Sequence, residues 1–365
     1  MLYLSAACGS RIGCCGGGAM RRGKREVAVA VTALVLLAVV AAVLSLVRHK
    51  GQGKDYGTPS PAERASIRIG VAMQPPSALA IIAHEEGLFS RAGVDATVVE
   101  YPSGKRALLE GLLPGEVDLV TTAAVPVVFG SFDRSDSRIV AAICSMDTDA
   151  RVVARKDKGI AAPADLRGKR IATQRGSAVH FFLHLFLIKN GLSERDVEVS
   201  FMKAEELAPA LSAGEIDAFS MREPYVSDAT ELLGDNAIVM AEPGLYFRTE
   251  LLVALGSFIE QHPETMERAL LAMLQAEEFA EANREKAIDL VARKLGADRD
   301  VIAALWGRMY LRVSLDQSVL LSLEDIARWT VGSGFVSLDT VPNYMEFLYL
   351  PALERAKPEA VTVIR

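Results

Sequence analysis

The sequence predicts an α/β fold of two lobes, with an added C-terminal helical segment and an N-terminal transmembrane helix. Three observations lead to this prediction. An uncharged apolar run covers residues 27–47, β-branched runs alternate with helical patterns between residues 66 and 220, and helical patterns follow residue 250. Such alternation indicates parallel strands with helices packed on both faces of the sheet.

The composition describes a folded chain rather than a disordered or nucleic-acid-binding one. The 365 residues are 50% hydrophobic and 24% charged, which is enough apolar content for two cores. The formal charge is -6 and the body carries no basic block, so nucleic acid is not expected as a partner. Three of the four cysteines lie in the first fifteen residues, so Cys144 has no disulfide partner within the body.

The N-terminal region has the pattern of a membrane anchor. Residues 27–47 are long enough to cross a hydrocarbon core of about 30 Å. Four basic residues between positions 21 and 25 predict that residues 1–26 are cytoplasmic and that the body is exported. The run is longer than the apolar core of a signal peptide, so an uncleaved anchor is favoured over a cleaved signal. Met20 is an alternative to Met1 as the start.

We therefore expect the body on the periplasmic or extracellular face of the cytoplasmic membrane. Residues 48–65 are rich in Gly, Pro, Ser and charge, and they predict a flexible linker between anchor and body. This stretch contains almost no apolar side chain that would need to be buried.

The first half of the body predicts three strands separated by helices. Strands are expected at residues 67–72, 96–101 and 117–121, and helices at 78–87 and 104–111.

The same order returns in the second half of the body. Strands are expected at residues 170–173, 197–201 and 216–220, and helices at 178–190 and 204–213. A Gly-Glu-aliphatic-Asp turn leads into a strand in both halves, at Gly115 to Asp118 and at Gly214 to Asp217, which is a weak internal echo.

The C-terminal third predicts helices that pack on the first lobe. They are expected at residues 264–283, 285–295, 299–309, 322–332 and 338–344. The first lobe is accordingly predicted to comprise residues 66–150 and 245–365, and the second lobe residues 151–244.

Ligands of open α/β sheets bind where strands end and helices begin, because free N–H groups and a positive dipole end meet there. In the first lobe this rule selects Gln74 and Ser77 after the first strand, and Thr121 and Thr122 at a later strand end. A plain helix cap at Ser77 and a satisfied loop at the threonines are the structural alternatives.

In the second lobe the same rule selects two further segments. Gly176 and Ser177 open a helix and form the best candidate for binding an anion. Arg222 and Glu223 follow the strand at residues 216–220, and a guanidinium there would pair with a carboxylate, sulfonate or phosphate. The alternative is a salt bridge between Arg222 and Glu223.

The sequence contains no motif that predicts catalysis, a metal or a cofactor. His180 and His184 are spaced i, i+4, but no third ligand follows at metalloprotease spacing, so packing histidines are favoured. Ser177 lacks the second glycine of a nucleophile elbow. We therefore expect a binding protein and not an enzyme.

Several segments in this order and spacing resemble one known family. They are PSA to EGLF at 76–89, GEVDL at 115–119, DLRGKRIA at 165–172, GS at 176–177 and GEIDA to EPY at 214–225. The chain thereby resembles the nitrate/sulfonate/taurine substrate-binding family of ABC importers. This resemblance implies a type II periplasmic-binding-protein fold, in which two Rossmann-like lobes are joined by two crossovers near residues 144–155 and 240–250.

The resemblance also implies a function. Members capture a small anionic or zwitterionic solute, such as a sulfonate, taurine or nitrate, and deliver it as monomers to an ABC permease. The family's Trp-Asp/Glu-Pro motif is replaced here by Arg222-Glu223-Pro224, which exchanges an aromatic residue for a cation. The alternatives are a membrane-tethered ligand-sensing domain and, less favoured, a thiamin-precursor or menaquinone-type biosynthetic enzyme.

Overall fold

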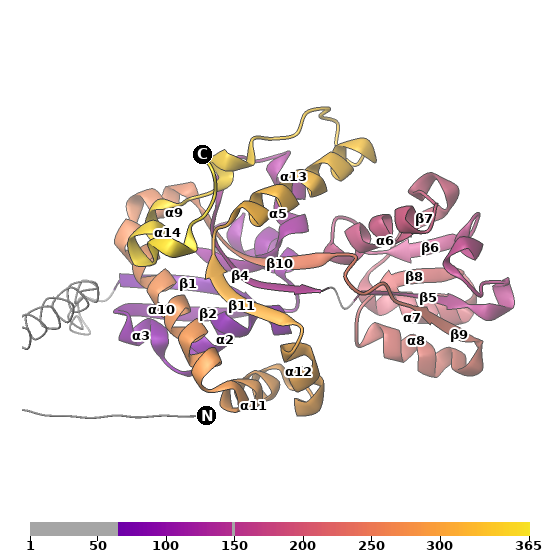
Figure 1. Cartoon of the computed structure of the whole chain (residues 1–365), viewed down its shortest axis with the longest axis horizontal. Coiled ribbons are helices and arrows are strands. Elements are labelled where there is room, and N and C mark those ends of the chain that lie inside the picture. Colours follow the sequence, from indigo (N-terminus) through magenta and orange to yellow (C-terminus); the bar gives the residue numbers. More distant parts are fainter. Residues whose placement is uncertain (1–64, 148–149) are drawn as a thin grey trace, which may run out of the picture. The chain divides into compact units, whose positions relative to one another are not determined.

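The computed structural model describes residues 65–147 and 150–365 (Figure 1). The predicted cytoplasmic segment 1–26, the apolar run 27–47 and nearly all of the predicted linker lie outside the described residues. Within the described ranges, no helix is long and apolar enough to cross a membrane. The α/β class predicted for the body is confirmed, as the two sheets below show.

The first sheet is mixed in strand direction. In the described part of the chain it has six strands in the order β11-β4-β10-β3-β1-β2. The strands are β1 (Ala65–Ala72), β2 (Val94–Tyr101), β3 (Leu119–Ala123), β4 (Ser137–Asp147), β10 (Phe247–Leu255) and β11 (Met309–Ser314). β1 runs parallel to β2 and β3, whereas β10 runs antiparallel to β3 and β4. Every residue of β3 is buried, which fits a central strand covered on both faces.

The second sheet repeats this plan on a smaller scale. Over the residues described, five strands lie in the order β7-β6-β8-β5-β9. They are β5 (Arg151–Arg155), β6 (Arg170–Thr173), β7 (Glu198–Phe201), β8 (Ala218–Met221) and β9 (Ala237–Met240). β6 runs parallel to β7 and β8, and β5 runs antiparallel to β8 and β9. The chain passes from the first sheet to the second between β4 and β5 and returns between β9 and β10 (Figure 1).

Helices pack on the faces of both sheets because each strand-to-strand crossover must return along the sheet. In the first two-thirds of the body they are α2 (Ala78–Glu85), α3 (Leu88–Arg91), α4 (Gly104–Arg106), α5 (Ala124–Ser131), α6 (Ala178–Lys189), α7 (Ala204–Ala213) and α8 (Tyr225–Leu233). α4 continues as one wider turn of helix over Ala107–Leu112. Single turns of 3-10 helix occur at Pro75–Ser77, Lys156–Lys158, Pro163–Leu166, Glu194–Asp196 and Gly234–Asn236.

The C-terminal third also contains helices, as predicted. They are α9 (Gly256–Gln261), α10 (Pro263–Ala282), α11 (Arg284–Leu295), α12 (Arg299–Trp306), α13 (Gln317–Gly332) and α14 (Pro351–Ala356), with 3-10 turns at Tyr344–Phe347 and Pro358–Ala360. α10 packs against α2, α3 and β11 on the first sheet, and α13 packs against α5. α10 therefore lies on the first sheet, whereas α11 packs on α2, α10 and α12.

Two predictions for this third are wrong. The region after residue 250 is not all helical, because β11 pairs antiparallel with β4 at the sheet edge. Residues 338–344 do not form the predicted helix and run as a loop into the 3-10 turn Tyr344–Phe347. The pairing partner of β11 lies more than 160 residues earlier in the chain, so local periodicity alone does not reveal it.

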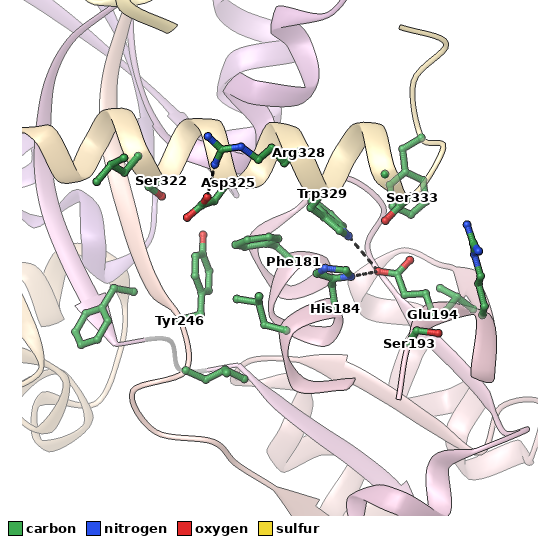
Figure 2. Close-up of a pocket in the computed structure, with 18 of the residues that line it drawn as sticks. Phe181, His184, Ser193, Glu194, Tyr246, Ser322, Asp325, Arg328, Trp329 and Ser333 are labelled. Atoms are coloured by element: carbon green, nitrogen blue, oxygen red, sulfur yellow. Dashed lines mark hydrogen bonds and ion pairs between the residues drawn. The ribbon is translucent and has the colours of Figure 1, made fainter. Parts of the chain in front are cut away.

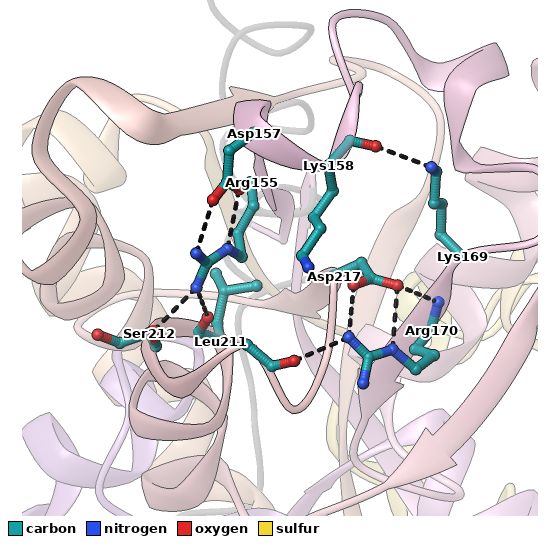
Figure 3. Close-up of polar contacts among 9 residues, drawn as sticks. Arg155, Asp157, Lys158, Lys169, Arg170, Leu211, Ser212 and Asp217 are labelled. Atoms are coloured by element: carbon teal, nitrogen blue, oxygen red, sulfur yellow. Dashed lines mark hydrogen bonds and ion pairs between the residues drawn. The ribbon is translucent and has the colours of Figure 1, made fainter.

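The internal echo of the sequence has the same structure in both sheets (Figure 3 shows the second). Asp217 accepts hydrogen bonds from the backbone N, Nε and Nη2 of Arg170 at 3.0, 3.2 and 2.7 Å. Asp118 accepts the equivalent three from Arg68 at 2.8, 3.2 and 2.6 Å. Asp118 thus ties the start of β3 to its parallel neighbour β1, and Asp217 ties the start of β8 to β6. Both aspartates lie at the amino ends of these strands, whereas ligands are expected at the carboxyl ends.

We expect Asp217→Asn and Asp118→Asn to lower the free energy of unfolding by similar amounts, about 1–2 kcal/mol each. The amide removes the charge that strengthens two side-chain hydrogen bonds in each case. Because the two sites belong to different sheets, the double variant should lose the sum of the single losses. Urea unfolding measures all three, and a double variant no less stable than either single variant would contradict the independence of the two sites.

Candidate ligand-binding cleft

A cavity of about 490 Å³ lies where strands of both sheets end, and we call it the cleft. The first sheet contributes Gln74 after β1, residues 103–106 after β2, and Ala123 at the end of β3. The second sheet contributes Phe201 to Lys203 at the end of β7, Arg222 after β8, and four residues after β6, namely Gln174, Arg175, Ser177 and Ala178. The predicted site residue Gly176 is absent from the described lining of the cleft. The rule that ligands bind outside the carboxyl ends of strands therefore selects this cavity.

The walls of the cleft are strongly basic. Of the residues that the structure describes, six cationic side chains line it against two carboxylates: Lys105, Arg106, Arg175, Lys203, Arg222 and Arg248 against Glu110 and Glu206. Arg106 is paired with Glu110 through Nε at 2.8 Å. An excess of positive charge in a recessed site attracts and holds anions.

The floor of the cleft on the first sheet is a buried polar network. Arg248 donates to Glu250 at 2.7 Å and to Gln74 Oε1 at 3.1 Å. Ser77 Oγ is 2.9 Å from Thr121 Oγ1 and donates to Glu250 Oε1 at 3.4 Å. These five side chains are all at least nine-tenths buried. The network holds Gln74 and Arg248 at the cavity surface, while Ser77 and Thr121 lie beneath it.

The hydroxyl groups of Ser77, Thr121 and Thr122, which were predicted to contact the ligand, lie beneath the cleft surface instead. Thr121 Oγ1 accepts the backbone N–H of Ala72 at 2.8 Å, which ties β3 to the end of β1. Thr122 is also fully buried, and its Oγ1 has no hydrogen-bond partner among the described residues. Ser77, Thr121 and Thr122 are absent from the described lining of the cleft.

The N-terminus of α6 opens at the opposite wall. Ser177 and Ala178 line the cleft, and Ser177 Oγ donates to the carbonyl of Gln174 at 2.6 Å. The N–H of Gly176 is donated to His180 Nδ1 at 3.2 Å. Gly176 has φ +61°, a conformation that favours glycine, and a Cβ there would lie 2.9 Å from the Phe129 ring. The positive end of the α6 dipole thus faces the cleft through Ser177 and Ala178.

Arg222 and Glu223 point to different places. Arg222 lines the cleft and an adjoining cavity of about 450 Å³. Glu223 is exposed and accepts hydrogen bonds from Ser227 N at 3.1 Å and Ser227 Oγ at 2.8 Å. Its carboxylate therefore serves the first turn of α8, and within the described residues it lines neither cavity.

Sequence reasoning missed several cleft residues that follow the same strand-end rule. Lys105 and Arg106 follow the last residue of β2 by four and five positions, and Lys203 follows the last residue of β7 by two. Lys105 Nζ donates to the carbonyl of Arg175 at 2.6 Å, a contact between the segments that follow β2 and β6. Burial, with the nearby Arg175 charge, lowers the pKa of Lys105. These residues could have been found from the sequence, because they are basic residues two to five positions beyond the end of a predicted strand.

Gly104 is required for the close approach of the β2 and β3 ends. A Cβ at this position would lie 2.6 Å from Thr122 Cα, and that backbone atom cannot move without shifting β3. We expect Gly104→Ala to cost about 1–3 kcal/mol of unfolding free energy, as overpacking does. Gly130→Ala in α5 is the matched control, since nothing lies within 4 Å of its Cβ. Thermal unfolding compares them, and equal effects would contradict the close-packing argument.

The two histidines of α6 lie in an aromatic cluster. His180 is fully buried, with its ring centroid 4.8 Å from those of Trp329 and Phe335. His184 Nδ1 lies 3.4 Å from Glu194 Oε1. Over the ranges 65–147 and 150–365, no group of three metal-ligating side chains comes together.

Comparisons with known proteins agree with this geometry. The family profile described as NMT1/THI5 like matches residues 74–287. A protein of Escherichia coli named for binding aliphatic sulfonates is 26% identical over 206 residues, which cover 56% of this chain and 64% of that protein. A Bacillus subtilis protein of the same name is 28% identical over 270 residues, or 73% of this chain and 80% of that protein.

A solved structure shows the same fold. The alkanesulfonate-binding protein SsuA from Xanthomonas axonopodis pv. citri, bound to MOPS, superposes with a TM-score of 0.65 at 23% identity. The superposition covers 79% of this chain and 99% of that one. The described body therefore has the α/β periplasmic-binding-protein fold, with mixed sheets.

Proposed function

This chain belongs to the NMT1/THI5-like family, and from this premise we propose that it is an extracytoplasmic solute-binding protein that captures a small organic sulfonate. The relatives described above are named for binding aliphatic sulfonates or alkanesulfonates. In this chain the ligand would sit between the two sheets, and its destination would be an ABC permease.

The observation that carries the proposal is the charge of the cleft. Six cationic side chains and the N-terminus of α6 face a space that holds two carboxylates. A sulfonate is ionised at any physiological pH and offers three oxygens to N–H donors. Guanidinium groups and helix N-termini bind such oxyanions by charge-assisted hydrogen bonds. Arg222 and Lys203 stand on one side of the space, and Gln74 and Arg248 stand on the other.

Binding without chemical conversion fits the hydroxyl groups near the cleft. Ser177 Oγ donates to a backbone carbonyl, and Ser77 Oγ is engaged with Thr121 and Glu250. In the described part of the chain, neither of these hydroxyls hydrogen-bonds to a histidine that would activate it as a nucleophile. The cleft is thus suited to hold an anion and release it unchanged.

The lobes would capture the solute by closing on it. The first lobe would comprise residues 66–150 and 245–365, and the second lobe residues 151–244. Rotation about the β4–β5 and β9–β10 connections would bring their contacts onto one ligand, which favours the closed state by differential affinity. The closed protein, on the periplasmic side of the membrane, would then dock on the permease.

Thermal unfolding of the full chain with matched ligands tests the proposal. Ethanesulfonate, taurine, propionate, ethylphosphonate and nitrate are compared with ethyl methyl sulfone, which has the shape of ethanesulfonate without its charge. A true ligand at 100 times its Kd adds about 2.7 kcal/mol to the free energy of unfolding. We expect stabilisation by a sulfonate and none by the sulfone. Equal shifts with both, or no shift with any anion, would refute anion capture.

A further inference from the structure

A second cavity has a volume of about 1220 Å³ (Figure 2). Its walls come from α6, the turn Glu194–Asp196, β7, the segment between β9 and β10, and α13. We call it the aromatic cavity. Phe201 is the residue that lines both this cavity and the cleft among those described. Nothing in the function proposed above uses this space.

Its walls are built from rings that contact one another. The Phe181 and Trp329 ring centroids are 5.1 Å apart, as are those of Phe181 and Tyr246. Trp329 also lies 5.5 Å from Phe335. Figure 2 shows Phe181 and Tyr246 standing beneath α13, from which Trp329 points toward His184. Such walls present flat apolar faces on which a planar ring can stack.

Among the described residues that line this cavity, two carboxylates (Glu194 and Asp325) and two guanidinium groups (Arg195 and Arg328) balance in formal charge. Arg328 is paired with Asp325 at 2.6 Å. Glu194 accepts from Trp329 Nε1 at 3.2 Å and lies 3.4 Å from His184 Nδ1. Burial alone would raise the pKa of Glu194, but the neighbouring His180 and His184 rings and the hydrogen bond from Trp329 lower it to about 2. The carboxylate is therefore ionised and already engaged, so an occupant need not carry charge, in contrast to the cleft.

A buried hydroxyl group at the cavity is left without a hydrogen-bond partner. Tyr246 is 5% exposed, and its hydroxyl has no hydrogen-bond partner among the residues described. Figure 2 shows the hydroxyl pointing up from the segment before β10 toward α13, across the cavity. A buried hydroxyl without a partner costs free energy, whereas a phenylalanine would fill the same position without that cost. A hydrogen-bonding occupant explains why the hydroxyl is there.

We propose that the aromatic cavity binds a neutral, planar aromatic molecule through ring stacking on Phe181 and Trp329 and a hydrogen bond between Tyr246 Oη and an oxygen of the ligand. The aromatic walls favour a planar ligand, and the balanced charges of the lining favour an uncharged one. Tyr246 sets the position of its oxygen. The proposal does not rest on the function proposed above. Because walls of the aromatic cavity come from both lobes, its test is made without sulfonate.

Trp329 itself can report occupancy. The chain has two tryptophans, Trp306 and Trp329, so a Trp306→Phe full-length chain emits from the cavity wall alone. The probe is 7-methoxycoumarin, which is neutral and planar, carries a carbonyl oxygen and absorbs where tryptophan emits. We expect saturable energy transfer from Trp329 to the probe.

Three variants in the same background locate the binding. Tyr246→Phe should weaken probe binding about tenfold, the effect of one lost hydrogen bond. Ser322→Phe, on the α13 wall, should abolish transfer by filling the cavity. Tyr310→Phe removes the hydroxyl of an exposed tyrosine on β11 and should change nothing. Circular dichroism verifies folding of each. The proposal is overturned by non-saturable transfer in the parent, or by equal affinities of the parent and Tyr246→Phe.

Discussion

Arg248→Met should be among the most damaging single substitutions in the body, with a loss of about 3–5 kcal/mol of unfolding free energy. Arg248 is 5% exposed and its partner Glu250 is fully buried. Methionine keeps much of the arginine volume but removes the cation that stands 2.7 Å from the Glu250 carboxylate. The carboxylate would then remain inside the protein without a compensating charge. Urea unfolding of the full chain measures the loss.

A double-variant cycle separates this cause from simple packing loss. Arg248→Met combined with Glu250→Gln leaves no buried charge and should be markedly more stable than Arg248→Met alone. As a matched control, Arg106→Met removes an ion pair whose side chains are about half exposed, and it should leave the unfolding midpoint nearly unchanged. Additive effects of the Arg248 and Glu250 substitutions would contradict the assignment of the loss to an uncompensated charge.

The fold was predictable from the sequence where its signals are local. The parallel strands β1, β2, β6 and β7 with their helices follow from apolar periodicity, which depends on neighbouring residues. The resemblance to the substrate-binding family is confirmed by the match over residues 74–287. Antiparallel β10 and β11 were not predicted as strands, because their partners are distant in the sequence.

Because β10 was not predicted as a strand, the buried polar network at the floor of the cleft was not predicted either. Arg248 and Glu250 are two positions apart on β10 and so point to the same face of the strand, where they pair. From the sequence, residues 240–250 are interpreted as a crossover between the lobes. That interpretation does not predict that Arg248 and Glu250 lie beside Ser77 and Thr121. Recognising residues 247–255 as a strand would have predicted the ion pair.

The candidate site was predictable in position and less so in role. The strand-end rule selected Gln74, Ser177 and Arg222, and the structure brings all three to one cavity. Glu223 adjoins Arg222 in the sequence, yet its side chain is held by Ser227. Such a local hydrogen bond competes with a role in the site, and sequence position alone does not reveal which one prevails.

Arg222→Met should weaken sulfonate binding by about 10- to 150-fold, which corresponds to the loss of a charge-assisted hydrogen bond of about 1.5–3 kcal/mol. Arg222 lines both the cleft and the adjoining cavity after β8. Its side chain is only partly buried, so the variant should fold with nearly unchanged stability. Isothermal titration with the sulfonate that stabilises the parent gives both affinities.

Salt and a neighbouring variant distinguish a direct contact from a general field effect. If Arg222 binds the anion directly, the affinity of the parent should fall with added salt, and Arg222→Met should show a shallower decline. Glu223→Gln is the matched control, because it changes the charge one residue away at a side chain that caps α8 outside the cleft. It should alter the affinity less than twofold. If Glu223→Gln changed the sulfonate affinity as much as Arg222→Met does, whether upward or downward, backbone disturbance before α8 would govern binding rather than the guanidinium.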